Sequence, residues 1–466
     1  MLFNSFEFLI FFPLVTILFF LLPHRFRWMM LLIASCVFYC YFIPAYLLIL
    51  IFTIVVDYYA GILIEEGKSN KKLWLVCSIV ANVGILAVFK YFNFFISNIN
   101  EAFGANVPLL NIILPVGLSF HTFQAMSYTI EVYKGNFKAE RNIGIYALYV
   151  LFYPQLVAGP IERPQNVLPQ IRSQHKFSSE NLLDGLRLMT WGFFKKLVIA
   201  DKASQYVDIV YKNPHEYHAL NVCLAIFLFS IQIYCDFSGY TDIARGAART
   251  MGFRLMVNFE RPLFSKSIRE FWQRWHISLS SWFRDYVYIP LGGNRVKTPK
   301  MILNLAIVFG LSGLWHGAGW NFIIWGLMHA VFVIISLFLL RKNILVRNIF
   351  GLIITNFLVA YALVFFRNPS VQHAVDIICS SFKFSNGNVF SLGVNSNHNE
   401  ASISSHNMAA LLFFIAFMFF YEWRTDASLF KMKKYPFIDT LWFVGVISCI
   451  ILFGVFTKET FIYFQF

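Results

Sequence analysis

Charged residues are scarce in this 466-residue chain. Asp, Glu, Lys and Arg make up 13% of it, whereas hydrophobic residues make up 58%. A soluble globular domain carries about 25% charged residues, so this balance excludes a water-soluble protein. The chain also lacks an internal repeat and a separate soluble domain, and we therefore expect residues 1–466 to form a single integral membrane domain. The fold class expected is an all-α polytopic membrane protein.

Signal-peptide and metal-site features are also missing. The first apolar stretch, residues 6–22, has no basic residues before it and no small-residue cleavage site, and is interpreted as a retained transmembrane helix. The seven cysteines show no C-x-x-C spacing and lie mostly in apolar runs. We predict packing roles for nearly all of them, with no disulfide framework and no bound metal.

Long apolar runs predict about eleven or twelve transmembrane helices. The runs begin near Phe6, Trp28, Tyr46, Leu73, Ile112, Asn181, Ala219, Met301, Trp320, Ile349, Met408 and Phe437. Residues 143–160 are apolar too, but Gly159-Pro160 interrupts them. Counting them as a full crossing would place the basic clusters 134–141 and 163–176 on opposite sides of the membrane. We therefore expect 143–160 to be a re-entrant segment.

The net charge of +14 comes from short Lys and Arg clusters between apolar runs. That distribution follows the positive-inside rule and argues against a nucleic-acid partner. It favours the headgroups of the lipid bilayer or an acidic partner at the cytoplasmic face.

The segment 311–320 is a glycine-rich break that carries one histidine, His316, between two apolar runs. The glycines of this region are Gly310, Gly313, Gly317 and Gly319. An ionisable side chain inside a membrane is unfavourable unless it faces a polar interior. Two interpretations stay open at this point. The segment is either a tight helical hairpin with a hydrogen-bonded histidine, or a site where substrate approaches the backbone closely.

The basic stretch 245–300 predicts an amphipathic helix. Ser267 and Glu270 have the spacing of a capping box, and Pro290 ends the helix. Trp272, His276, Leu279 and Phe283 would share one helical face. On spacing alone, such a helix lies in the interface or dips into the bundle, and His276 is a buried histidine bonded to a carbonyl.

Five motifs together carry a family resemblance. They are YCDFSGYTD (234–242), NFERP (258–262), EFWQRWHISLS (270–280), IPLGGN (289–294) and GLWHG (313–317). The chain resembles the membrane-bound O-acyltransferase (MBOAT) family, in its bacterial alginate O-acetylation branch, which is related to the teichoic-acid D-alanylation protein. The resemblance is dense over about residues 110–330. One departure is His121, where a tyrosine is expected in that branch.

The resemblance implies a ring of about 11–12 transmembrane helices, with re-entrant and interfacial helices, around a central tunnel. It also implies that His316 is the essential catalytic histidine and His276 the second motif histidine. The residues expected to line the tunnel or bind the donor are Trp315, Gly317, Arg274, Trp275, Ser278, Arg284, Asp285, Asp236 and Asn321. His329 is assigned to packing.

The activity implied is transfer of an acyl group, acetyl above all, from a cytoplasmic thioester across the membrane to a cell-surface polysaccharide such as alginate or peptidoglycan. Histidine suits the chemistry because its unperturbed pKa, near 6.5, lets it accept the proton of the attacking hydroxyl. The donor would be acetyl-CoA or another acyl thioester, held by coenzyme A or an acyl carrier protein, with no bound cofactor. An extracytoplasmic acetyltransferase partner would complete delivery from the bacterial cytoplasmic membrane.

Two alternatives remain. The first is D-alanyl transfer to teichoic acid from a carrier protein, since the basic stretch 245–300 suits an acidic carrier as well as the phosphates of coenzyme A. The second is a proton-coupled transporter, in which His316 and buried carboxylates relay protons. Transporter folds usually show inverted repeats, and the sequence shows none.

Overall fold

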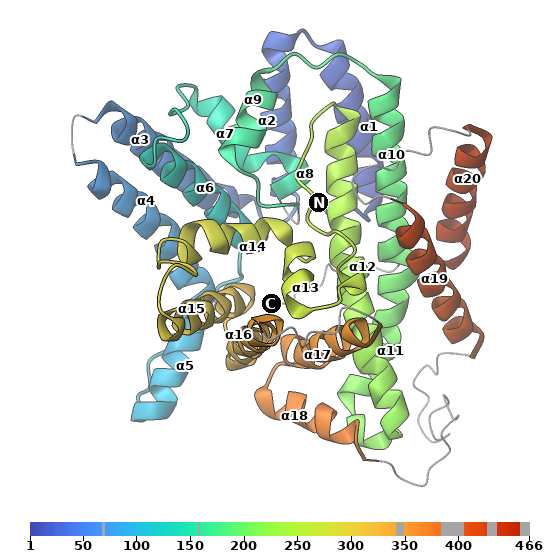
Figure 1. Ribbon diagram of the computed structural model, residues 1–466. Coiled ribbons are helices and arrows are strands. Elements are labelled where there is room, and N and C mark those ends of the chain that lie inside the picture. The colour runs from blue at the N-terminus through green and yellow to red at the C-terminus, as the bar shows by residue number, and fades with distance from the viewer. Residues whose placement is uncertain (68–69, 157–158, 342–348, 384–404, 426–435, 457–466) are drawn as a thin grey trace. The chain divides into compact units, whose positions relative to one another are not determined.

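A computed structural model describes the chain except for residues 68–69, 157–158, 342–348, 384–404, 426–435 and 457–466. The described residues form helices joined by loops, and they include no strand (Figure 1). The all-α prediction is therefore confirmed. The chain divides into two compact units, one of residues 1–189 and 240–256 and the other of residues 190–239 and 257–466.

Among the described residues, 7 helices are long and apolar enough to cross a membrane. They are Pro44–Glu66, Lys71–Phe103, Ala219–Thr250, Thr298–His316, Trp320–Leu339, Ile349–Arg367 and His406–Arg424. Two shorter apolar helices are Phe6–Leu21 and Thr440–Phe453. The protein is a multi-pass membrane protein, as predicted.

The first unit is built from residues 240–250 of α12 (Ala219–Thr250) together with ten further α-helices or parts of α-helices. They are α1 (Phe6–Leu21), α2 (His24–Cys40), α3 (Leu47–Glu66), α4 (Lys71–Leu86), α5 (Phe92–Phe103), α6 (Leu118–Tyr133), α7 (Ile143–Leu151), α8 (Tyr153–Leu156), α9 (Pro164–Arg172) and most of α10 (Ser179–Phe193). Helix α3 packs against α4 and α6, and α2 packs against α7. Some buried polar groups of this unit are hydrogen-bonded to one another. Asp57, for example, accepts hydrogen bonds from Ser78 at 2.6 Å and from Asn82 at 2.9 Å.

The predicted re-entrant segment consists of short helices. In residues 143–160, the nine-residue α7 ends at Leu151 and the four-residue α8 follows from Tyr153. Nine helical residues extend about 14 Å, roughly half of the hydrocarbon core of a bilayer. A continuous helix does not cross the membrane here, which agrees with the prediction of a broken element.

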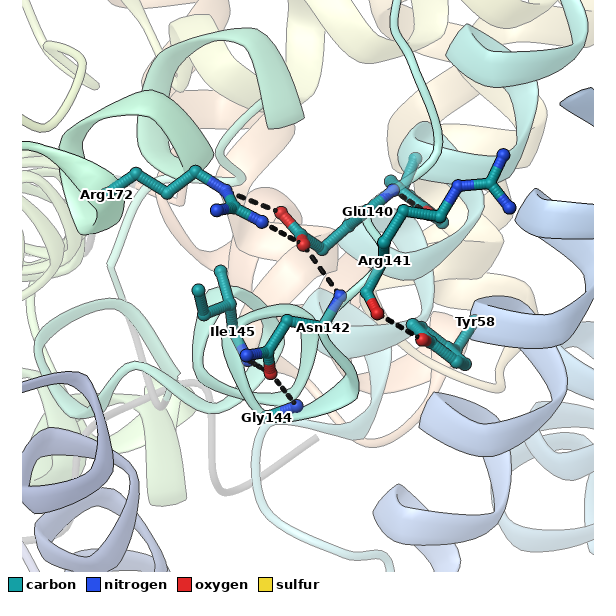
Figure 2. Close-up of polar contacts among 8 residues, drawn as sticks. Tyr58, Glu140, Arg141, Asn142, Gly144, Ile145 and Arg172 are labelled. Atoms are coloured by element: carbon teal, nitrogen blue, oxygen red, sulfur yellow. Dashed lines mark hydrogen bonds and ion pairs between the residues drawn. The ribbon is translucent and has the colours of Figure 1, made fainter. Parts of the chain in front are cut away.

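Side chains of the α6–α7 loop fix the start of α7 (Figure 2). Asn142 caps the helix by accepting hydrogen bonds from Gly144 N and Ile145 N. The buried carboxylate of Glu140 accepts from Asn142 N at 2.8 Å and from Arg172 Nε at 3.0 Å. The α6–α7 loop is therefore held in one conformation by specific hydrogen bonds, although its Lys and Arg residues are typical of a basic surface cluster.

The second unit contains four of the five motifs and residues 234–239 of the remaining one. Its helices are the π-helix η3 (Phe194–Ala200), α11 (Asp201–Lys212), the first part of α12 (Ala219–Thr250), α13 (Ile268–Arg274), α14 (Ile277–Phe283), α15 (Thr298–His316), α16 (Trp320–Arg341), α17 (Ile349–Arg367), α18 (Val371–Ser380), α19 (Ser405–Arg424) and α20 (Pro436–Phe453). Residues 181–200, one of the predicted crossings, lie in α10 and η3.

Two lysines of η3 are buried, and each has a polar partner. Lys196 forms ion pairs with Asp201 at 2.7 Å and with Asp236 at 2.6 Å. Lys195 donates a hydrogen bond to Ser238 at 2.8 Å. Compensated charges of this kind are the form in which lysine is tolerated in an apolar interior.

Helices α15 and α16 form a close hairpin. A Cβ added to Gly313 would lie 2.2 Å from the backbone oxygen of Phe322, and one added to Gly326 would lie 2.2 Å from that of Phe309. Each helix therefore needs glycine where it crosses the other. A Cβ on Gly317 would collide with the Phe322 ring at 2.1 Å. Of the two interpretations of segment 311–320, the tight helical hairpin is the one observed for the backbone.

Candidate active site

The predicted helix through His276 is broken. Its start is as predicted, because Ser267 Oγ accepts a hydrogen bond from Glu270 N at 3.2 Å. Helix α13 nevertheless ends at Arg274, and α14 begins only at Ile277. The prediction that Trp272 and His276 share one face of a continuous helix is wrong.

The residue at which the helix is interrupted, His276, adopts a left-handed backbone conformation. His276 has φ 44° and ψ 54°, a conformation that costs a residue with a Cβ roughly 1–2 kcal/mol. Such a residue persists only where its surroundings hold it, and outliers of this kind cluster at functional sites. Here the segment 258–260 runs beside the turn. Ile277 N donates to Asn258 O at 2.9 Å, and Glu260 N donates to Arg274 O at 2.9 Å.

The His276 ring is fully buried among aromatic rings. Its exposed fraction is 0%, and its centroid lies 4.7 Å from that of Phe237 and 6.1 Å from that of Trp315. Burial lowers the pKa of His276 to about 3, because the charged ring would lose its hydration. His276 is therefore neutral at physiological pH. Its Nδ1 lies 3.2 Å from Asn258 Oδ1.

His316 is the last residue of α15 and lies in an aromatic cage. Ring centroids of Trp315, Trp325 and Phe366 lie 4.9, 5.2 and 5.1 Å from its own. Only 4% of the residue is exposed. These rings therefore enclose most of the imidazole. The predicted central tunnel stays a prediction.

The two motif histidines lie together. Their ring centroids are 6.2 Å apart, with Trp315 in contact with both rings. Even with a nitrogen of each ring turned toward the other, the two atoms would be about 4 Å apart, beyond the roughly 3.2 Å limit of a direct hydrogen bond. A single oxygen atom placed between the rings can lie within hydrogen-bond distance of both. This arrangement is suited to handling the proton of one hydroxyl group.

Comparison with known proteins decides the family. Residues 140–367 match the membrane-bound O-acyltransferase family. A peptidoglycan O-acetyltransferase of Helicobacter pylori is 34% identical over 75% of this chain and 72% of its own length. A probable alginate O-acetylase of Pseudomonas aeruginosa is 38% identical, over 82% of this chain and 75% of its own. The chain belongs to the membrane-bound O-acyltransferase family. It is an O-acyltransferase, as the motif resemblance implied.

A more distant relative of this O-acyltransferase is a teichoic acid D-alanyltransferase of Bacillus subtilis. It is 31% identical over 48% of this chain and 59% of its own length. The part of the chain that matches the family includes both His276 and His316.

Several predicted site residues of the O-acyltransferase surround the histidine pair. Trp315 contacts both rings, and Ser278 shares the Asn258 side chain with His276. Trp275 instead stacks on Phe271, at a centroid distance of 5.3 Å. Gly317 provides the space for the Phe322 ring.

Two further predicted residues support the site from its edges. Asn321 donates to the backbone oxygens of Phe365 and Asn368 at 3.3 and 2.7 Å, and so fixes the end of α17 that carries Phe366. Asp236 binds Lys196, and the residue after it, Phe237, contacts the His276 ring.

Three charged residues predicted for the site form local ion pairs. Arg274 pairs with Glu270 at 2.7 Å, and Arg284 pairs with Asp285 at 2.8 Å. The Arg284 side chain is 62% exposed, in contrast to the buried histidines. A role for these residues in binding the donor stays a prediction.

The contacts of His329 with Trp272 and Trp325 were not predicted from the sequence. His329, assigned to packing, also accepts a hydrogen bond from Trp272 Nε1 at 3.3 Å, and its ring lies 5.0 Å from that of Trp325. Trp325 thus contacts both His316 and His329. The only available signal was the four-residue spacing of Trp325 and His329, which places them on one helical face.

Proposed function

We propose that this O-acyltransferase moves an acetyl group from a cytoplasmic thioester to a hydroxyl group on the route to a cell-surface polysaccharide. The observation that carries the proposal is the buried His276–His316 pair within the family-matched segment. Acetyl is favoured over D-alanyl because the relatives named for O-acetyl transfer match more of this chain, at higher identity, than those named for D-alanyl transfer. Alginate, peptidoglycan and another exopolysaccharide are the candidate acceptors.

The reaction requires one proton to be moved. The hydroxyl oxygen attacks the thioester carbonyl carbon while His316 accepts the hydroxyl proton. The tetrahedral intermediate then collapses, the C–S bond breaks, and the departing sulfur takes the proton from the imidazolium. The products are the acetyl ester, the free thiol and neutral His316. No metal ion or bound cofactor is needed for this balance.

The aromatic cage has a role in this scheme. Rings of Trp315, Trp325 and Phe366 surround His316 and keep bulk water from the reacting thioester. Water activated by the same histidine would hydrolyse the donor. Exclusion of water therefore favours transfer to the polysaccharide route over wasteful hydrolysis.

We infer the acyl donor and the partner proteins from the location of the protein in the membrane. We assign the protein to the bacterial cytoplasmic membrane, with acetyl-CoA or an acyl carrier protein on the cytoplasmic side and an acetyltransferase partner outside. The basic stretch 245–300 supports this arrangement, because Lys and Arg side chains attract the phosphates of coenzyme A and the acidic surface of a carrier.

The test combines a donor assay with a cellular assay. Purified protein in lipid nanodiscs is given acetyl-CoA or a D-alanyl carrier thioester together with a hydroxyl acceptor, and thiol release is measured. O-acetylation of cell-surface polysaccharide is measured by mass spectrometry in a deletion strain complemented with each variant. We expect His316→Ala to abolish both signals while the protein stays abundant in the membrane.

His406→Ala is the matched control, because His406 is an exposed histidine of the same unit. It should retain both signals. Acetylation that persists in His316→Ala would refute the assigned role of His316. If thiol is released only from the D-alanyl thioester, the activity is D-alanyl transfer and not acetyl transfer.

A further inference from the structure

We propose that Asn258 is a positioning residue that fixes the tautomer of His276, so that Nε2 is its only proton-accepting atom. The inference rests on the proposed acyl transfer by the histidine pair. It assigns a role to Asn258, which is not among the site residues predicted from the sequence, and it states which nitrogen of His276 can accept a proton.

The Asn258 side chain has a determined orientation. Its Oδ1 lies 3.3 Å from the backbone nitrogen of Ser278 and 2.9 Å from Ser278 Oγ. A backbone N–H group can only donate, so the Asn258 atom that faces it must be the amide oxygen and not the amide nitrogen. The same oxygen lies 3.2 Å from His276 Nδ1.

The tautomer of His276 follows from this orientation. An amide oxygen has no hydrogen to give, so Nδ1 of His276 must carry the proton of that hydrogen bond. A neutral imidazole has one N–H group, which leaves the lone pair on Nε2. Because burial keeps the ring neutral, this tautomer is the resting form. His276 can then accept a proton or a hydrogen bond at Nε2 but cannot donate from it.

Asn258 also holds the backbone that presents the ring. Its carbonyl oxygen accepts from Ile277 N at 2.9 Å, so one residue binds three in succession, from His276 to Ser278. Asn258 is itself 0% exposed. These contacts stabilise the left-handed His276 and keep the ring beside His316, 6.2 Å away. The orientation and the tautomer of His276 are therefore both set by Asn258.

Two substitutions of Asn258 distinguish a role in positioning His276 from a role in protein stability alone. Asn258→Leu removes the acceptor at similar volume, and should lower kcat for thiol release by roughly 10²-fold with KM for acetyl-CoA nearly unchanged. Asn258→Asp keeps the acceptor and adds a negative charge beside the ring, which favours protonated His276. It should recover activity at high pH, and the acidic limb of its kcat–pH profile should move to higher pH than in the wild type.

Asn304→Leu is the matched control. Asn304 is a buried asparagine of the same unit that donates to the backbone oxygens of Leu291 and Gly293. It should lose thermal stability but retain kcat and the pH profile per folded molecule. All variants are assayed as full-length protein in nanodiscs, with membrane abundance and melting temperature measured alongside.

The outcomes distinguish this inference from the function on which it rests. Folded Asn258→Leu with wild-type kcat, or Asn258→Asp that is as inactive as Asn258→Leu and shows no shift of the acidic limb, would overturn it. Wild-type protein that releases no thiol, or His316→Ala that remains active, would instead overturn the proposed function. With wild type active and His316→Ala inactive, the Asn258 variants alone decide the matter.

Discussion

In the α15–α16 hairpin, substitution of glycine by alanine should have different effects on stability at two positions, Gly313 and Gly310. Gly313→Ala would place a Cβ 2.2 Å from the Phe322 carbonyl oxygen, which belongs to the backbone and cannot rotate away. Gly310→Ala, three residues earlier in the same helix, would place its Cβ 3.7 Å from a methyl carbon of Leu327, an ordinary van der Waals contact.

The magnitudes follow from these distances. Overpacking against fixed backbone costs about 1–3 kcal/mol, which should appear as a lower melting temperature for Gly313→Ala. Alanine is favoured over glycine inside a helix by about 0.5–1 kcal/mol, so Gly310→Ala should be neutral or stabilising. Both glycines lie inside α15, so the gain in helix propensity applies to both variants, and their unfolding free energies should differ by the overpacking cost of about 1–3 kcal/mol.

The assay is thermal unfolding of the purified full chain in detergent, followed by tryptophan fluorescence, together with thiol release from acetyl-CoA. Gly313→Ala should also reduce activity, because Gly313 lies one turn before His316 and a displaced helix moves that ring. Gly326→Ala, which meets Phe309 O at 2.2 Å from the opposite helix, should reproduce the loss. Equal melting temperatures for Gly313→Ala and Gly310→Ala would refute the close-crossing explanation.

Three further predictions concern buried groups. Lys196→Met leaves two buried carboxylates without their cation and should cost about 3–5 kcal/mol, seen as low membrane abundance; normal abundance would contradict the ion-pair assignment. The pKa of His276 is about 3 when folded and near 6.5 when unfolded, so the unfolded state binds more protons between these values. Stability should be constant above about pH 7 and fall on acidification, by up to about 1.4 kcal/mol per pH unit, and His276→Gln should flatten that slope in pH-dependent melting. Phe366→Ala opens the cage of His316 and should raise hydrolysis of acetyl-CoA in the absence of an acceptor; an unchanged hydrolysis rate would argue against water exclusion by that ring.

The features that could be predicted from the sequence are those that depend on local composition. Apolar runs of about 20 residues indicate membrane helices wherever they occur, and the helix start at Ser267 needs only the spacing to Glu270. A broken segment at 143–160 was predicted from Gly159-Pro160, but the helix already ends at Leu151, several residues before that pair. The choice of His276 and His316 as catalytic candidates came from motif resemblance and not from periodicity, and their proximity is a finding of the structure.

The features that could not be predicted depend on contacts between distant residues. Left-handed His276 has no signature of its own, because the conformation is held by Asn258, eighteen residues earlier. The partners of Lys196 in the 181–200 segment, Asp201 and Asp236, could likewise not be identified from the sequence. Periodicity alone therefore predicted a continuous helix at His276, where tertiary hydrogen bonds impose a turn.

The close crossing of α15 and α16 has a consequence for the range of acyl chains that this enzyme can accept. A Cβ added to Gly313, Gly317 or Gly326 would lie 2.1 to 2.2 Å from a neighbouring atom, so the hairpin that carries His316 has no room for larger side chains at these positions. The Phe366 ring reaches the same imidazole from α17, a helix without that restriction at this position. Engineering for longer acyl donors should therefore begin with smaller side chains on α17, with the hairpin left intact.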